Sequence, residues 1–252
     1  MFEKSLKNYD FQIYLQPKVP TNPTKDCDAE ALARWKHPEE GMIPPGEFIP
    51  ILERSPKICD LDLYMFEQVC RLVSQWIRDG KTVTRVSVNV SRFHLRDAGT
   101  DICKKYREIK EMYQIPDGVI ELELTETLLL EDNQLSFVKK VLDGFRSCGL
   151  KVSLDDFGFA YSSLALLKEF EVDVLKLDRS FFVSENKKSR KIVQNIIRLA
   201  HDLGMCVVAE GIEKMEQVDM LREMGCDLIQ GFVYSKPLPV KEFESWRDAR
   251  RK

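Results

Sequence analysis

The sequence has no apolar run near the roughly 20 residues that a membrane-spanning helix needs, and its first ten residues lack a signal-peptide core. It also has no CxxC pair. Its seven cysteines are scattered through apolar segments, as is typical of reduced core thiols in a cytosolic protein. We therefore expect a cytoplasmic protein without a membrane segment, or the soluble part of something larger.

The sequence has no excess of positive charge. Lysine and arginine number 38 against 41 aspartates and glutamates, so the net charge is -3 and the isoelectric point is near 5.8. A surface that binds DNA or RNA is normally basic. Nucleic-acid polymers are therefore not expected partners.

Short apolar segments with strand patterns alternate with amphipathic helical patterns along the chain. The length of 252 residues and the hydrophobic content of 44% are enough for one sizeable core. The predicted strands are residues 11–16, 27–34, 85–90, 119–125, 151–155, 174–178, 206–210 and 228–232. The predicted helices are residues 48–54, 61–78, 137–148, 188–203, 215–224 and 240–250. Three of these helices end at a glycine just before the next strand.

Eight strands that alternate with helices across about 250 residues predict a (β/α)8 TIM-type barrel, an α/β fold, with residues 1–252 as one domain. A doubly wound open sheet is the structural competitor. It would be expected to carry a glycine-rich phosphate loop after an early strand, and the sequence has none.

Every predicted strand has a polar or ionisable side chain in or just after its apolar stretch. These are Gln16, Glu30, Asn89, Glu123, Asp155 with Asp156, Lys176 with Asp178, Glu210 and Gln230. Strand alternation supports a common inward face, and chemistry in such a barrel lies at the C-terminal strand ends. One such residue is most often a satisfied core group or a helix cap. Convergence of eight strand ends at one rim is not explained in that way.

Six of these side chains are carboxylates, and a single lysine among them would leave a large negative charge in one pocket. Asp155 and Asp156 in particular repel when both are ionised, unless a cation binds or a pKa rises. Oxygen ligands suit Mg²⁺ or Mn²⁺ rather than Zn²⁺, and we interpret His37, His94 and His201 as surface or loop residues. A site that holds two metals about 3.5–4 Å apart suits phosphoryl chemistry, which predicts a metal-dependent phosphoesterase.

These residues also fall in short motifs along almost the whole chain. The motifs are Glu30-Ala31-Leu32-Ala33-Arg34-Trp35, Asn89-Val90-Ser91, Glu123-Leu124-Thr125-Glu126, Asp155-Asp156-Phe157-Gly158, Lys176-Leu177-Asp178, Ala209-Glu210-Gly211-Ile212-Glu213 and Gln230-Gly231. In this order and spacing, the chain resembles the EAL-domain cyclic di-GMP phosphodiesterases of bacterial second-messenger signalling. The resemblance implies a barrel whose first strand runs antiparallel to the others.

The resemblance further implies a role for each matching residue. The first metal would be held by Glu30, Asn89, Glu123 and Asp155. Asp155 would bridge to a second metal, bound also by Asp156 and Glu210, directly or through water. Lys176 would hold the attacking water and Glu210 would be the general base. The implied reaction is hydroxide attack, activated by two Mg²⁺ or Mn²⁺ ions, on one phosphodiester of cyclic di-GMP to release linear pGpG.

Other matching residues would contact the substrate or order a loop. Substrate contacts would come from Gln16, Arg34 and Gln230, and Arg34 is physically suited to a phosphate oxygen. Asp178 would lie near the metals or the substrate, with its role left open. Glu126 and Glu213 would support the loop after the fifth strand. A homodimer is expected from the family, and sensor or cyclase domains would lie outside this chain.

The sequence departs from the family pattern in the loop after the paired aspartates. Phe159 and Ala160 stand where the family usually has small residues and a second glycine. If that backbone needs a positive φ, alanine costs about 1 kcal/mol and would misplace the aspartates. A harmless local variant is the alternative reading.

Other functions remain open beside the active phosphodiesterase. One is a catalytically silent domain that binds cyclic di-GMP or a partner protein, and another is an unrelated barrel enzyme acting on a different phosphoester. Degenerate family members generally lose acids from the metal set, and none is lost here. We therefore favour the enzyme.

Overall fold

The fold is a closed barrel of eight strands. A computed structural model describes the chain except for residues 1, 96–100, 126–134, 159–162, 184–185 and 251–252. The barrel strands in sequence order are β1 (Phe11–Pro20), β2 (Asp28–His37), β4 (Val86–Asn89), β5 (Ile120–Thr125), β6 (Lys151–Phe157), β7 (Val174–Leu177), β8 (Cys206–Ala209) and β9 (Leu228–Gln230). β1 pairs with both β9 and β2 and closes the barrel. The predicted barrel is confirmed.

β1 runs against its two barrel neighbours. It pairs antiparallel with β2, where Gln16 lies opposite Glu30, and antiparallel with β9, where Lys18 lies opposite Gln230. The pairs from β2 through β4, β5, β6, β7 and β8 to β9 are all parallel. The antiparallel first strand implied by the family resemblance is therefore confirmed.

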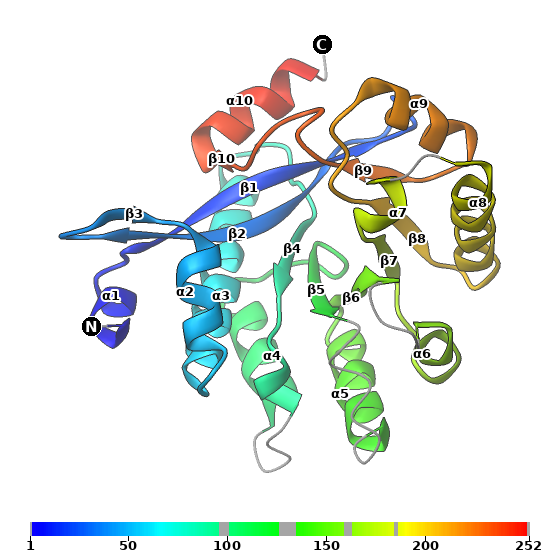
Figure 1. Ribbon diagram of the computed structural model, residues 1–252. Coiled ribbons are helices and arrows are strands. Elements are labelled where there is room, and N and C mark those ends of the chain that lie inside the picture. Colours follow the sequence, from blue (N-terminus) through cyan, green and yellow to red (C-terminus); the bar gives the residue numbers. More distant parts are fainter. Residues whose placement is uncertain (1, 96–100, 126–134, 159–162, 184–185, 251–252) are drawn as a thin grey trace.

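Helices cover the outside of the barrel (Figure 1). They are α3 (Lys57–Arg78), α4 (Ile102–Met112), α5 (Leu135–Ser147), α6 (Ser163–Glu169), α7 (Ser180–Val183), α8 (Lys187–Asp202), α9 (Met215–Glu223) and α10 (Val240–Arg250). On α3, residues spaced by three and four, including Phe66, Val69 and Val73, have no exposed surface and pack in the main core. None of the described helices is long and apolar enough to cross a membrane.

β2 extends past the barrel as a hairpin with β3 (Gly41–Ile43), which projects from one side in Figure 1. Beside it lie α1 (Phe2–Lys7) and α2 (Pro45–Leu52), the latter confirming the short helix predicted near residues 48–54. A second apolar cluster fixes this corner, with the rings of Phe11 and Trp35 stacked 5.1 Å apart. Because β2 continues to His37, Glu30 lies within the strand rather than at its end.

Two of the histidines predicted as surface or loop residues are buried. His37 ends β2 and is 4% exposed, and His94 lies in the 3-10 helix η1 (Arg92–Leu95) and is 6% exposed. Nε2 of His94 lies 3.2 Å from Oδ2 of Asp62, which also accepts a hydrogen bond from the Ser91 backbone. The periodicity of the sequence does not predict that these two side chains are buried. His201 is exposed on α8, as expected.

Candidate active site

The ammonium group of Lys176 lies at the centre of the candidate site. Lys176 is on β7, points into the barrel and is 1% exposed. Its Nζ lies near carboxylate oxygens of Glu123 (2.6 Å), Glu210 (2.7 Å), Asp155 (3.0 Å) and Glu30 (3.8 Å). Glu123 comes from β5, Asp155 from β6 and Glu30 from β2. Glu210 directly follows β8. The structure therefore brings together the predicted acids of four strands.

Glu30 is held on both oxygens by amide side chains. Asn89, the last residue of β4, donates to Oε1 at 3.1 Å, and Gln230, the last residue of β9, donates to Oε2 at 2.6 Å. The Gln230 amide also lies 3.2 Å from Oε1 of Gln16. Two of the predicted amides thus hold this carboxylate, and the third, Gln16, contacts one of them.

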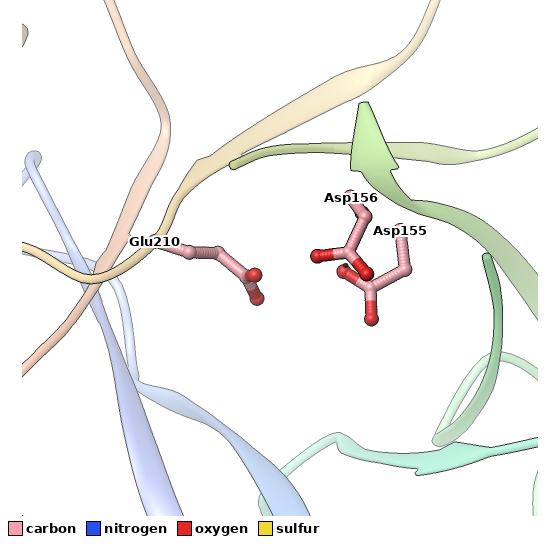
Figure 2. Close-up of side chains that lie close together, drawn as sticks. All are labelled: Asp155, Asp156 and Glu210. Carbon is pink, nitrogen blue, oxygen red and sulfur yellow. Dashed lines mark hydrogen bonds between the residues drawn. The ribbon is translucent and has the colours of Figure 1, made fainter. Parts of the chain in front are cut away.

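Asp155 and Asp156 turn their carboxylates to the same side despite being neighbours in sequence. Neighbouring side chains of a regular strand point to opposite faces. Here the pairing of β6 with β7 shifts register between Leu154 and Phe157, and Asp156 adopts φ 55°. Figure 2 shows both carboxylates facing that of Glu210, and ligand atoms of the three residues lie within 4.8 Å of one another. A bulge therefore builds this cluster.

The electrostatics of the site favour a bound cation. Burial raises the pKa values of Glu30, Asp155 and Glu210, and neighbouring acids add to the effect. Burial also raises the pKa of Asp156, and the charge of Asp178 raises it further. Oε1 of Glu210 is buried and makes no directed hydrogen bond within the described residues, although Lys176 lies 2.7 Å away. One ammonium group does not neutralise these carboxylates, and a divalent ion would.

Two cavities meet at Glu30. The larger, about 530 Å³, is lined by Asn89 and Asp156 together with residues of α2 and α3. The smaller, about 240 Å³, is lined by Asp155, Lys176, Glu210 and both predicted glutamines. The acids therefore lie between two spaces, and the larger is of a size that small-molecule sites use.

Other predicted residues lie at the margin of the site. Arg34 donates to the Ala33 carbonyl at 2.9 Å, with its guanidinium 5.3 Å from the centre of the Tyr14 ring. Asp178 accepts a hydrogen bond from the Ser180 backbone at the start of α7. Glu213 is exposed and lines the smaller cavity. Glu126, Phe159 and Ala160 lie outside the described residues.

The prediction of a single lysine among the acids is wrong. Lys18 on β1 is 1% exposed, and its Nζ contacts Glu121 at 3.2 Å and Glu123 at 2.8 Å. The signal was present, because Lys18 follows Gln16 by two residues and shares its strand face. Arg179, which directly follows Asp178 in the sequence, also lines the smaller cavity and was missed.

Comparisons with known proteins find a matching family model and curated relatives. The family model described as "EAL domain" matches residues 1–237. The cyclic di-GMP phosphodiesterase PdeR of Escherichia coli is 36% identical over 245 residues, which are 96% of this chain and 36% of PdeR. The signaling protein YkoW of Bacillus subtilis is 33% identical over 248 residues, which are 98% of this chain and 30% of YkoW. The chain thus spans about a third of these relatives.

Solved structures show the same architecture. The PaMucR phosphodiesterase in its c-di-GMP complex has a TM-score of 0.85 and 30% identity, covering 96% of this chain and 97% of that one. The EAL domain of FimX from Pseudomonas aeruginosa bound to c-di-GMP has a TM-score of 0.84 at 18% identity, a likeness of fold.

Proposed function

The chain belongs to the EAL domain family, and on that premise we propose that it is a metal-dependent phosphodiesterase that hydrolyses cyclic di-GMP to linear pGpG. The observation that supports this most is the convergence of Glu30, Glu123, Asp155 and Glu210 around Lys176. The acids are carried by separate strands of the barrel, which fixes their positions relative to one another.

The donor set fits hard divalent cations. Carboxylate and amide oxygens without nitrogen or sulfur ligands suit Mg²⁺ or Mn²⁺. We assign a first metal to Glu30, Asn89, Glu123 and Asp155, and a second to Asp155, Asp156 and Glu210, with Asp155 shared. Two bound cations would neutralise charge on the phosphate and acidify a water molecule.

The chain's own residues would orient and deprotonate that water. Lys176, a buried ammonium with a pKa above its ordinary value, donates hydrogen bonds and never accepts a proton at neutral pH. Burial disfavours its charge, but Asp155 and Glu123 outweigh burial. Oε1 of Glu210 lies 2.7 Å from Nζ of Lys176, within reach of a water that the lysine would hold. We therefore assign water positioning to Lys176 and general-base action to Glu210.

The two cavities provide room for the substrate on both sides of the acids. Gln16 and Gln230 line the smaller one, beside Lys176. Arg34 presents a planar fork suited to a phosphate oxygen, once it turns from the Ala33 carbonyl. Asp178 is assigned to the substrate side, and Glu126 and Glu213 to ordering of the loop after β6.

Product analysis tests the proposal. The protein is incubated with cyclic di-GMP and Mg²⁺ or Mn²⁺, and the nucleotides are separated chromatographically. Formation of pGpG is expected, and omission of metal should stop it. Tight binding of cyclic di-GMP without turnover would contradict the enzyme and favour the silent receptor.

We also propose that further domains accompany this chain and that the chain forms a homodimer. PdeR and YkoW extend well beyond the matched region, so sensor or cyclase domains are proposed as partners outside this chain. A homodimer is proposed from the family. Light scattering coupled to gel filtration would give twice the mass of 29.3 kDa for this chain if it is correct.

A further inference from the structure

Lys18 crosses the interior of the barrel to reach the candidate metal site from below its rim. Its strand, β1, has β2 and β9 as barrel neighbours, whereas its two partners, Glu121 and Glu123, lie on β5. β2 and β4 separate β1 from β5 in the sheet. The contacts therefore run through the barrel rather than along its wall.

Each oxygen of Glu123 has a separate lysine partner. Oε1 lies 2.8 Å from Nζ of Lys18, and Oε2 lies 2.6 Å from Nζ of Lys176. Glu123 is 1% exposed, so solvent does not compete for either oxygen. Lys18 thus fixes the rotation of this carboxylate and leaves Oε2 on the side where Glu30, Asp155 and Glu210 converge.

Glu121 balances the charge of Lys18 away from that convergence. Its Oε1 is 3.2 Å from Lys18, and Glu121 is 3% exposed. Lys18 and Glu121 thus form a neutral buried pair beside Glu123. Burial disfavours the charged form of Glu123, but Lys176 and Lys18 together outweigh it and hold its pKa at about 2.

We propose that Lys18 is a positioning residue for the metal site, which holds Glu123 so that one defined oxygen, Oε2, is offered to a cation. This inference rests on the proposed function for the assignment of Glu123 to a metal. A purely structural role is the alternative, in which Lys18 only neutralises buried acids. The two roles separate when buried charge is kept constant and the contact with Glu123 is removed.

The double variant K18M/E121Q does this, because it removes one positive and one negative charge together. Mn²⁺ binding is measured by titration calorimetry without nucleotide, beside thermal unfolding. Loss of a group that orients a metal ligand typically weakens metal binding roughly 10–100-fold. We expect that loss in the double variant, with a melting temperature near that of the wild type. Wild-type Mn²⁺ affinity in a folded double variant would overturn the proposal.

A second measurement does not depend on how the variant folds. In a crystal structure of the wild-type protein with Mn²⁺, Glu123 should bind through Oε2 while Oε1 stays within hydrogen-bond distance of Lys18. Binding through both oxygens, or no Mn²⁺ binding at all, would overturn the proposal. Mn²⁺ binding of the expected kind without pGpG formation would contradict the proposed function and leave the role of Lys18 standing.

Discussion

The backbone N–H of Asp156 donates a 2.9 Å hydrogen bond to Oδ1 of Asp155. With φ of 55° at Asp156, this contact ties two adjacent carboxylates into one turn and gives them a common direction. Left-handed backbone is uncommon outside glycine, and aspartate and asparagine are the residues that best tolerate it. The conformation at Asp156 thus belongs to the construction of the site.

Replacement of Asp156 by asparagine should separate its backbone role from its charge. Asparagine accepts the same φ, so Asp156→Asn should fold as the wild type does. With an amide oxygen in place of the second carboxylate, we expect calorimetry to show the second Mn²⁺ bound more weakly than in the wild type, and turnover to fall with it. Mn²⁺ binding as tight as that of the wild type at both sites would contradict the assignment.

Removal of the carboxylate of Glu30 or of Glu210 should abolish turnover. Glu30→Ala removes the carboxylate that Asn89 and Gln230 hold, and Glu210→Ala removes the proposed general base. Loss of a general base lowers rate on the order of 10²–10⁴-fold. Glu216→Ala, at an exposed position in the first turn of α9, is the matched control and should retain full activity. Chromatographic assay of pGpG decides, and full rate in either site variant would refute that position.

Stabilisation by metal should grow as pH rises. Burial raises the pKa values of Glu30, Asp155 and Glu210, so the metal-free folded state holds protons there more tightly than the unfolded chain. Stability from these groups is present below the unfolded carboxyl pKa and is lost as pH rises through the folded values. A bound cation would compensate the charge of the ionised carboxylates and so offset that loss of stability. The Mn²⁺-induced rise in melting temperature should therefore be larger at about pH 8 than at about pH 5, and a pH-independent rise would contradict it.

Gly231 should resist substitution because of backbone contact rather than conformation. A Cβ there would lie 1.9 Å from the Ile212 carbonyl oxygen, which cannot move as a flexible side chain would. Gly231→Ala should displace the segment after Gln230 and cost about 1–3 kcal/mol of unfolding free energy. Gly46→Ala, where a Cβ meets no described atom within 4 Å, is the matched control. Urea denaturation of both variants measures the difference, and equal stability would contradict the clash.

Lys18→Met should destabilise the protein far more than an average substitution. Removal of one partner of a buried ion pair typically costs about 3–5 kcal/mol, because a charge is left uncompensated. Addition of Glu121→Gln should recover much of that loss. Chemical denaturation of the single and double variants tests this. A double variant no more stable than the single would contradict the charge balance between Lys18 and Glu121.

The barrel and most of the acids could be predicted because their signals are local. The period of two in Leu175-Lys176-Leu177-Asp178 correctly placed Lys176 inside the barrel. Carboxylates at strand tips then followed from the common rim of parallel strands. The antiparallel β1 came from the family resemblance, since strand pattern carries no direction.

The features that the sequence did not predict depend on contacts between residues that are distant in the sequence. The strand predicted over residues 11–16 ends at Gln16, whereas β1 continues to Pro20 and includes Lys18. Asp62 with His94 is a further case, because α3 and η1 meet only in three dimensions. The φ of Asp156 also followed from no residue pattern.

The candidate site takes its acids one or two at a time from separate strands, and this has an evolutionary consequence. Glu30, Glu123, Asp155 and Glu210 each belong to a different strand or strand end, and the apolar core lies mainly between strands and helices. A single substitution at one acid would remove part of the proposed metal site while the apolar contacts between strands and helices remain. Loss of the proposed hydrolysis with retention of the barrel is therefore open to a single mutation, by drift or by selection.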